Sequence, residues 1–537
     1  MTNFLRSPFN ETLSGGEKAS IPCSRATGRW ILAATILASS MAFIDGTVVN
    51  VALPALQRAF QADVVDVQWV IEAYSLLLAA FLLTGGSLGD EFGRRRVFLL
   101  GVALFAIASV GCGLAATIAQ LIAARAVQGL GAALLVPGSL AIISSSFAVE
   151  ERGRAIGTWS GFSAITAAIG PVLGGWLIEH VSWRAVFFIN VPLAALVIAI
   201  SFWRVPESAN PEKNSLDWLG AVLGVLGLGT LVYGLIESSR AGFTHPTVAC
   251  SLAASAVLLT LFVLSETKSS HPMLPLGLFR ERSFVGANIL TLLLYAALGG
   301  TLFFLPLNLI QVQRYTPTAA GAALLPFILI MFLLSRWSGG LIAKYGAKIP
   351  LVIGPLIAAA GFALFLRPGV GGTYWTTFFP AIAVLGLGMA VSVAPLTTTV
   401  MNSVPESRVG VASGINNAVS RAAGLLAIAV FGIVMLQSFD WLLKRQLQKT
   451  PLAPAAQAAL TEQRDRLAGV EFPSDLDPAS RQLARRTIDQ SFVGGFRVVM
   501  ALGVLLALGS AICARLLIPS PNDKQNSPAG RKNRAHR

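Results

Sequence analysis

The sequence contains few charged residues for its length. Only 12% of its 537 residues are charged, 54% are hydrophobic, and the mean hydropathy is +0.69. A soluble domain carries about a quarter charged residues, so the deficit excludes a soluble enzyme. The apolar residues form runs of about twenty, which is the length an α-helix needs to cross roughly 30 Å of hydrocarbon. We therefore expect an all-α polytopic membrane protein.

Residues that build other kinds of site are scarce or scattered. The four cysteines show no CxxC spacing, so neither a zinc site nor a disulfide framework is predicted. The four histidines are spread over loops and tails, whereas an enzyme would need convergent His, Cys or acidic groups. A pump driven by ATP is disfavoured because the sequence has no GxxxxGK[ST] phosphate loop. We predict no metal, no cofactor and no enzymatic activity.

The formal net charge of +14 lies in short clusters between the apolar runs and in a basic tail at 524–537. Such clusters orient membrane proteins, so we interpret them as topological signals and predict no nucleic-acid partner. With both termini inside, the short inner loops hold thirteen basic residues and the short outer loops hold five. The inner residues are Arg94, Arg95, Arg96, Arg152, Arg154, Arg204, Lys213, Lys268, Arg280, Arg282, Lys344, Lys348 and Arg408; the outer residues are Arg58, Arg184, Arg240, Arg314 and Arg367.

Fourteen apolar runs are predicted to be membrane-spanning helices. They occupy residues 30–53, 67–89, 97–116, 119–146, 155–178, 185–203, 217–236, 246–264, 284–309, 318–342, 350–366, 375–401, 410–435 and 492–518. Residues 1–29 lack the apolar region of a signal peptide, so we expect them to form a cytoplasmic N-terminal tail. Residues 519–537 are expected to form a basic cytoplasmic tail. The loop at 436–491 is rich in charges of both signs and is expected to face outside.

An internal repeat relates the two ends of the chain. The string GGSLGDEFGRRR at 85–96 follows the second predicted span, and GGLIAKYGAK at 339–348 follows the tenth, with two glycines in register. Two related halves around a central site are a common plan in transporters. We therefore predict a six-helix half at 30–204, two extra helices at 205–265 and a second six-helix half at 266–518.

The loop at 85–96 combines glycines with an aspartate and three arginines. The glycines allow a tight turn and close helix packing, and the aspartate can face a helix N-terminus or pair with an arginine. This pattern predicts a charge lock that a rocking motion must break, with a basic turn that only sets topology as the alternative. In the second half Ala343 replaces the aspartate, so the equivalent lock is weak or absent there. The lock residues are Gly86, Asp90, Gly93, Arg94 and Arg95.

The fifth predicted span contains the string GPVLGG at 170–175. A proline in the middle of a helix removes a backbone hydrogen bond and bends the helix, and glycines allow a neighbouring helix to approach closely. The combination predicts a hinge or a tight seal between halves, with packing alone as the alternative. The residues of this motif are Gly161, Gly170, Pro171, Gly174 and Gly175.

Three ionisable residues inside predicted spans are candidates for function, two of them, Asp45 and Glu72, for proton coupling. Asp45 is the deepest acid of the first span, and its burial without a function would be costly. Arg125 lies inside the fourth span, where it must either pair, face water or snorkel to the outer interface. Glu72, near the outer end of the second span, is predicted to attract cationic substrates or share the proton task, or to be a solvated carboxylate. The polar and aromatic residues expected to line a cavity are Asn50, Tyr74, Gln128 and Arg421.

Together these motifs resemble those of the major facilitator superfamily, in its branch of fourteen-span drug:proton antiporters. The string at 85–96 resembles the superfamily's signature loop, and 161–175 resembles its antiporter motif. The residues around Arg125 resemble its fourth-helix motif, which implies a role of Arg125 in proton coupling. The run DGTVVNVALP at 45–54 is similar to the first-helix motif of the fourteen-span branch. The resemblance implies the major facilitator fold, with two six-helix halves plus two extra helices. It also implies proton-coupled multidrug efflux across the cytoplasmic membrane by alternating access.

The resemblance leaves the transported compound open. The expected partners are a small organic substrate, often lipophilic or cationic, together with protons and membrane lipid; a periplasmic adaptor is left undecided. A dedicated exporter of one metabolite or lipid is the alternative function. A transporter-like sensor is less favoured, because both tails are too short for a signalling domain.

Overall fold

The regular structure of the chain is entirely helical. The computed structural model describes residues 25–209, 217–269, 274–405, 408–449, 463–470 and 477–519, with residues 272, 452, 457 and 460 between them. No strand occurs in this part of the chain. The predicted all-α class is therefore confirmed.

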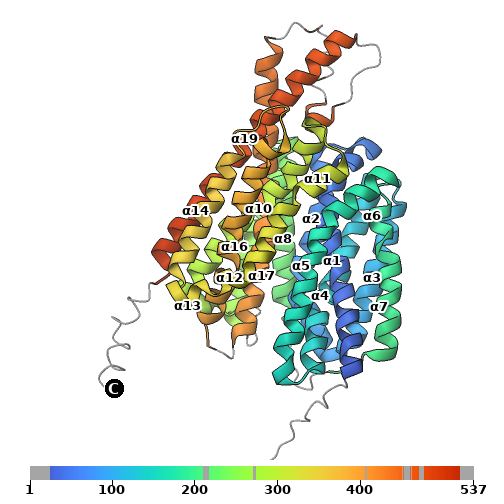
Figure 1. Ribbon diagram of the computed structural model, residues 1–537, viewed down its shortest axis with the longest axis vertical. Helices are drawn as coiled ribbons and strands as arrows, with labels where there is room; N and C mark the ends of the chain where they lie inside the picture. Colours follow the sequence, from blue (N-terminus) through green and yellow to red (C-terminus); the bar gives the residue numbers. More distant parts are fainter. Residues whose placement is uncertain are drawn as a thin grey trace, which may run out of the picture.

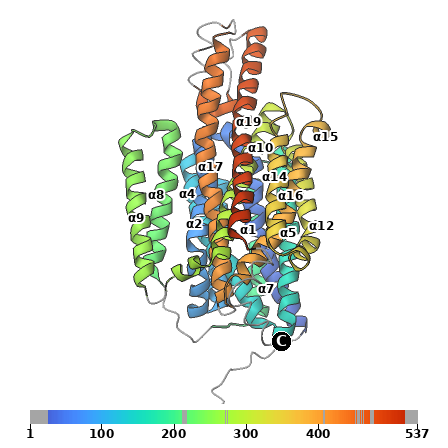
Figure 2. The ribbon, with the colours of Figure 1, turned by 90° about the vertical axis from the view of Figure 1, so that its left-hand side faces the viewer.

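The helices form two groups and a separate pair (Figure 1; Figure 2). The first group consists of α1 (Arg25–Phe60), α2 (Val64–Phe92), α3 (Arg94–Leu114), α4 (Ile118–Ser146), α5 (Val149–His180), α6 (Ala185–Phe188) and α7 (Asn190–Arg204). The side pair consists of α8 (Trp218–Ala241) and α9 (Pro246–Lys268). The second group consists of η1 (Leu276–Arg280), α10 (Arg282–Leu307), η2 (Asn308–Val312), α11 (Pro317–Ala323), α12 (Leu325–Gly339), α13 (Leu341–Tyr345), α14 (Lys348–Leu364), α15 (Tyr374–Thr377), α16 (Phe379–Asn402), α17 (Val409–Leu447), η4 (Arg464–Gly469) and α19 (Pro478–Leu517).

Twelve helices among the described residues are long and apolar enough to cross a membrane. They account for every predicted span except 155–178 and 350–366. The first of these ranges lies within α5, several of whose side chains are outside the described residues. The second corresponds to α14, an apolar helix of 17 residues. The chain is thus a multi-pass membrane protein.

Glycines bring neighbouring helices into close contact in both groups. A Cβ on Gly131 of α4 would lie 2.6 Å from the backbone nitrogen of Phe105 in α3. A Cβ on Gly388 of α16 would lie 2.4 Å from the backbone nitrogen of Ala358 in α14. Small residues matter here because lipid tails are as apolar as Leu, so packing rather than burial from water drives helices together.

Two helices extend beyond the rest of the bundle at one end. Figure 1 shows the last part of α17 and the first part of α19 projecting together, and we name this the hairpin end; the opposite one is the terminal end. The predicted borders of the loop at 436–491 are therefore wrong, because α17 continues to Leu447 and α19 begins at Pro478. Hydropathy falls in these stretches, but Leu443 and Ile488 remain buried. Packing between the two helices thus continues past the apolar layer.

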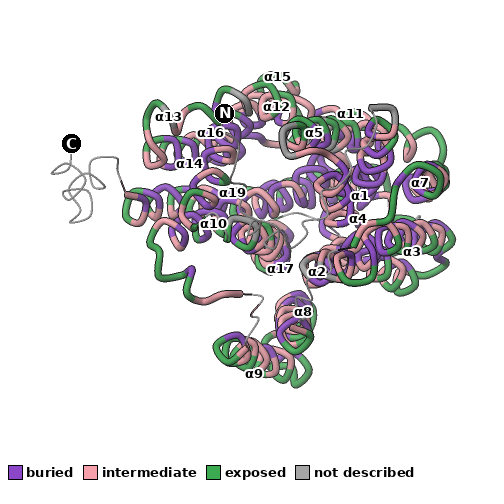
Figure 3. The backbone as a smooth tube through the Cα atoms, turned by 90° about the horizontal axis from the view of Figure 1, so that it is seen from below, coloured by how far each residue is buried: buried purple, intermediate pink, exposed green. Residues whose placement is uncertain are grey.

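The side pair lies outside the two groups, next to α2 and α17 (Figure 3). Polar contacts fix α8 to the start of α2: Trp69 donates to Glu237 Oε1 at 3.2 Å, and Arg240 pairs with Asp66 at 3.1 Å and with Asp63. Towards α17 the described residues of α8 form no hydrogen bond or ion pair. Within the pair, α8 is therefore anchored to the first group and only packs against α17 of the second.

Candidate functional site

The first group contains a buried ion pair between α1 and α4. Asp45 of α1 is fully buried and Arg125 of α4 is 1% exposed. The guanidinium of Arg125 contacts Asp45 Oδ2. Gln128 joins the pair: its Nε2 donates to Asp45 Oδ1 at 2.9 Å, and its Oε1 accepts from Arg125 at 2.6 Å. Such pairing allows both charges to exist where an isolated charge would be very costly.

Side chains from three more helices surround the pair. Ser109 of α3 accepts from Gln128 Nε2 at 2.8 Å and from Asn190 of α7 at 3.3 Å. Arg125 Nε donates to the carbonyl of Val70 in α2 at 3.0 Å. Its guanidinium carbon lies 4.2 Å from the centre of the Tyr74 ring, a distance at which the ring face attracts the cation. We name this set the ion-pair network; its side chains are those of Asp45, Tyr74, Ser109, Arg125, Gln128 and Asn190.

The network places several predicted residues differently from the sequence expectation. Arg125 does not snorkel to an interface, because it is buried and paired. Tyr74 and Gln128, expected to line a cavity, are 4% and 0% exposed and point into the network instead. Ser109 and Asn190 were not predicted, although an amide in an otherwise apolar run such as 185–203 is a usable signal.

Glu72 is buried away from this network. It is 0% exposed, and neither carboxylate oxygen has a hydrogen-bond partner among the described residues. Glu72 and Tyr74 are two positions apart on α2, so they face nearly opposite sides of the helix. One turn before Glu72, Gln68 donates to the carbonyl of Ile428 in α17 at 2.9 Å. Glu72 therefore lies where α2 meets the second group, and the solvated-carboxylate reading is contradicted.

Asn50 of α1 and Arg421 of α17 are the two expected cavity residues that lie outside the ion-pair network. Asn50 bonds only to the carbonyl of Gly46 one turn earlier, at 3.4 Å, and a Cβ on Gly46 would meet nothing within 4 Å. Arg421 of α17 forms no ion pair with any described residue and is close enough to Tyr74 for an electrostatic interaction. These positions are compatible with the expectation that Asn50 and Arg421 line a cavity.

The loop at 85–96 is held within the first group. Asp90 pairs with Arg94 at 2.8 Å, one turn along the chain, which is one of the two arrangements expected. Glu207, just after α7, was not predicted: it accepts from the backbone nitrogen of Arg95 at 3.0 Å and lies 3.7 Å from the guanidinium of Arg96. The closest approach to α4 is made by Gly85, where a Cβ would lie 2.2 Å from Ala133 O; at Gly86 the nearest atom is 3.6 Å away. All these contacts join helices of one group, so a lock acting here fixes α2, α3 and α7 to one another.

Gly93→Ala is expected to destabilise this loop. Gly93 has φ of +105°, which side chains rarely adopt, and its Cβ would lie 2.8 Å from Glu207 Oε1. Backbone strain of this kind costs on the order of 1–3 kcal/mol, so the thermal unfolding midpoint of the purified protein should fall. Gly89→Ala is the matched control, because its Cβ would meet only ordinary contacts at 3.8 Å. Equal midpoints for the two variants would show that the turn relaxes freely.

The glycine motif of α5 packs between α1 and α11. A Cβ on Gly170 would lie 2.2 Å from Thr47 Oγ1, and one on Gly174 would lie 1.8 Å from Val48 Cγ2, both in α1. On the other side, a Cβ on Gly175 would lie 2.3 Å from the carbonyl oxygen of Pro317 in α11. From α11, a Cβ on Gly321 would lie 2.1 Å from the carbonyl oxygen of Pro171. Gly161 lies outside the residues whose burial the structure describes. The two groups thus touch, backbone against backbone, along this motif.

Polar contacts between the groups gather towards the hairpin end. Besides the bond from Gln68, Gln311 Nε2 donates to Gln57 Oε1 at 2.7 Å, Thr318 N donates to Glu179 at 3.3 Å, and Arg466 donates to Gln61 Oε1 at 2.7 Å. The hydrogen bonds that the structure shows across the two groups thus lie towards the hairpin end. The structure is therefore closed at the hairpin end.

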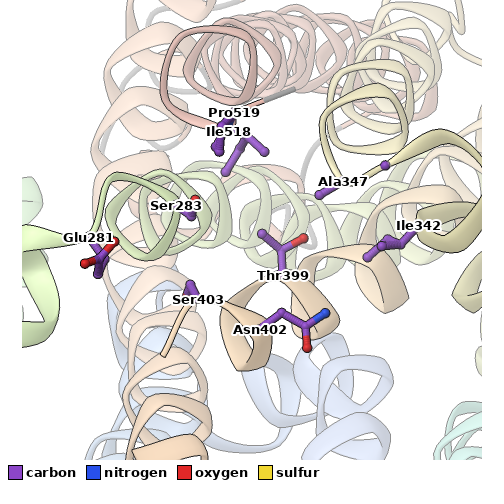
Figure 4. A pocket seen from close by; sticks show the side chains of 10 residues that line it. Glu281, Ser283, Ile342, Ala347, Thr399, Asn402, Ser403, Ile518 and Pro519 are labelled. Atoms are coloured by element: carbon purple, nitrogen blue, oxygen red, sulfur yellow. The ribbon is translucent and has the colours of Figure 1, made fainter. Parts of the chain in front are cut away.

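A cavity of about 370 Å³ lies at the terminal end within the second group (Figure 4). Its lining includes Glu281, Ile342, Thr399 and Asn402. It adjoins Gly346 in the second copy of the repeated loop and is remote from the ion-pair network of the first group. We therefore treat the network, and not this cavity, as the centre of the candidate site.

Comparison with known proteins identifies one family for this chain. The family model described as Major Facilitator Superfamily matches residues 35–428. The chain is 36% identical over 432 residues to multidrug resistance protein Stp of Mycobacterium tuberculosis, covering 80% of each protein. It is 32% identical over 507 residues to the tetracenomycin C resistance and export protein of Streptomyces glaucescens, covering 92% of this chain and 93% of that protein. It is 31% identical to the methylenomycin A resistance protein of Bacillus subtilis, covering 78% and 89%.

Solved structures show the same fold. A bacterial homologue of the human lysosomal transporter Spinster, in an inward-facing and occupied conformation, matches with a TM-score of 0.64 at 16% identity, covering 94% of this chain and 100% of that one. A D-xylose–proton symporter matches with a TM-score of 0.60 at 14% identity, covering 92% and 98%.

Proposed function

This chain belongs to the major facilitator superfamily, and from that premise we propose that it exports small organic compounds from the cell in exchange for protons. The named relatives are multidrug and antibiotic resistance proteins, one of them an export protein, and they align with 78–92% of the chain. The observation that carries the proton-coupled part is the buried Asp45–Arg125 pair. We propose no enzymatic activity.

We propose fourteen membrane-crossing helices in the cytoplasmic membrane, with α5 and α14 added to the twelve. The terminal end carries the basic clusters at 94–96 and 152–154, so the positive-inside rule favours placing that end and both termini in the cytoplasm. The hairpin end then faces outside. We propose that the first group is the six-helix half predicted at 30–204, that the side pair is the two extra helices at 205–265, and that the second group is the half at 266–518.

We propose that a proton binding to Asp45 drives the conformational change. In the closed hairpin-end state the carboxylate satisfies both Arg125 and Gln128. A proton on Asp45 cancels its charge and leaves Arg125 as a buried cation facing a neutral acid, an amide and a ring, which is unfavourable in a medium of low dielectric. Once Arg125 is no longer held by a charged Asp45, an arrangement in which α1 and α4 have moved relative to each other is favoured.

Substrate would reach the protein from the cytoplasm in the state seen here. Hydrogen bonds join the two groups towards the hairpin end, which supports an inward-facing conformation. Export then requires the contacts of α5 with α11 to separate as the hairpin end opens. Asn50 and Arg421 are the residues we propose to face the substrate.

The proposal is tested by substrate-triggered proton movement in inverted vesicles that contain the protein. A pH-sensitive dye and a panel of lipophilic cations and neutral antibiotics should reveal proton movement that starts on substrate addition. A response to many compounds supports multidrug efflux, and a response to one compound supports the dedicated exporter that names such as tetracenomycin C resistance and export protein suggest. Substrate export that persists without any proton movement would refute proton coupling.

Glu72→Gln is expected to lower the export of cationic compounds while leaving neutral ones nearly unchanged. Glu72 lies beside the second group, has no partner among the described residues and plays no part in the ion-pair network. In a state that exposes it to the substrate, it can therefore ionise and offer a charge to a cation. Transport rates for a matched pair of cationic and neutral substrates check this. Glu91→Gln, which removes an acid from the exposed loop, is the control. Equal loss for both substrates would instead assign Glu72 to the proton pathway.

A further inference from the structure

A second cavity, of about 400 Å³, lies at the hairpin end where α1 meets the second group. Three arginines line it: Arg58 in the last turn of α1, Arg314 just after η2, and Arg485 in the early part of α19. The rest of its wall is largely apolar and includes Pro54, Ile310, Pro317 and Val470. The cavity therefore combines positive charge with an apolar surface.

Among the described residues of this cavity, positive charge exceeds negative charge. Arg314 and Arg485 converge on one carboxylate, Asp489, at 3.1 and 3.3 Å, and both donate to the carbonyl oxygen of Gln311. Burial, together with the charge of Arg314, lowers the pKa of Arg485 despite the opposing effect of Asp489. Arg58 has no acidic partner among the described residues. Among the described residues, one carboxylate thus pairs with two of the three guanidinium groups, and the third has no acidic partner.

A buried amide adds an unused hydrogen-bond donor. Gln57 and Gln311 line the cavity and are only 5% and 8% exposed. Gln311 Nε2 donates to Gln57 Oε1 at 2.7 Å, which leaves Gln57 Nε2 without an acceptor and Gln311 Oε1 without a donor among the described residues. If both amides are turned over, the other nitrogen is free instead, so one N–H₂ group lacks a partner in either assignment. A buried donor without a partner costs free energy that a bound acceptor would recover.

Strained backbone surrounds the same cavity. Arg314 has φ of 61° and Leu467, next to the lining residue Ala468, has φ of 54°. The chain between Asn308 and Val312 forms a π-helix. Conformations of this kind are unfavourable and gather at ligand sites and moving parts, where the surroundings hold them in place.

We propose that this cavity binds an organic anion, a carboxylate or phosphate group carried on an apolar body, and that the bound anion holds the hairpin end closed. The guanidinium groups and the free amide suit the charged group, and the apolar wall suits the body. Gln57 and Arg58 belong to the first group, whereas Arg314 and Arg485 belong to the second. A ligand that contacts both stabilises the state in which they are close. This site is separate from the proposed proton and substrate pathway.

The test uses the full chain in phosphatidylcholine nanodiscs, with hexyl phosphate as the probe and the thermal unfolding midpoint as the signal. The midpoint of the unsubstituted protein should rise to saturation. Arg58→Gln should weaken the apparent affinity about tenfold, as expected for loss of one charge-assisted hydrogen bond. Arg58→Lys should restore part of it, and Arg367→Gln, outside the cavity, should leave it unchanged. Arg58 is chosen because its removal breaks no ion pair.

A second readout follows the closed state directly. Cysteines placed at Gln61 and Arg466, in a background without the native cysteines, should crosslink faster when hexyl phosphate is present. If the natural ligand is an anionic lipid, discs containing phosphatidylglycerol should show the higher midpoint already, in an Arg58-dependent manner. If it is a soluble anion, that lipid should change nothing while hexyl phosphate still binds. A midpoint that does not saturate, or equal responses of Arg58→Gln and Arg367→Gln, would overturn the proposal without touching the efflux function.

Discussion

Asp45→Asn is expected to abolish proton-coupled transport, lowering it to the level of vesicles without the protein. The asparagine can still accept from Gln128 but carries no charge that a proton could cancel. It also leaves Arg125 buried without a counter-ion, and breaking a buried pair in this way costs about 3–5 kcal/mol. The thermal midpoint should therefore fall together with transport, while the protein stays in the membrane. Both quantities can be measured on the same preparation.

A second variant separates loss of mechanism from loss of stability. Asp45→Asn combined with Arg125→Gln removes both buried charges, and replacing such a pair by neutral groups is often nearly neutral for stability. We expect this double variant to regain most of the midpoint and still not to transport. Proton movement that continues in Asp45→Asn would remove Asp45 from the mechanism, whatever the stability of the variant.

Gly175→Leu should trap the protein with its hairpin end open. Its Cβ would lie 2.3 Å from the carbonyl oxygen of Pro317 across the group boundary, and backbone cannot move aside as a flexible side chain can. Overpacking costs about 1–3 kcal/mol. Because the clash exists only in the closed state, it should shift the ratio of open to closed molecules by about 5- to 150-fold. Export should fall strongly, and a cysteine placed at Gln57 should react faster with a maleimide that cannot cross the membrane.

The chain supplies a partner variant and a control for this prediction. Gly321→Leu meets Pro171 across the same boundary and should behave like Gly175→Leu. Gly157→Leu lies on the same helix as Gly175 but meets nothing within 4 Å, so it should transport normally. Unchanged maleimide labelling in both boundary variants would mean that the glycines serve packing alone.

The membrane-spanning helices were predictable because hydrocarbon thickness fixes their length and lipid fixes their composition. The helical parts of the extension were not, since nothing in a polar segment shows that it packs against another segment forty residues away. Leu443 and Ile488 are apolar positions of that kind, and only the fold shows that they are buried in it.

The candidate site was predictable residue by residue but not as an arrangement. Asp45 and Arg125 each stand out because a charge inside a span is costly. Their pairing depends on how two helices are rotated about their axes, which hydropathy does not reveal. Gln128 could have been assigned to the pair, since it lies three positions from Arg125 and so shares its helix face. Glu207 could not, because it follows a span whose position beside the loop at 85–96 is a property of the packed bundle.

The polar contacts that attach α8 to α2 have a consequence for how α8 moves. Hydrogen bonds and ion pairs are directional and break when their partners shift, whereas apolar surfaces tolerate small sliding displacements. Because α8 has polar contacts with α2 and none with α17 among the described residues, we expect α8 to move together with α2. We then expect α17 to slide along the apolar surface of α8 when the second group moves during the transport cycle. The two additional helices would then guide the relative movement of the two groups and would not contact the substrate.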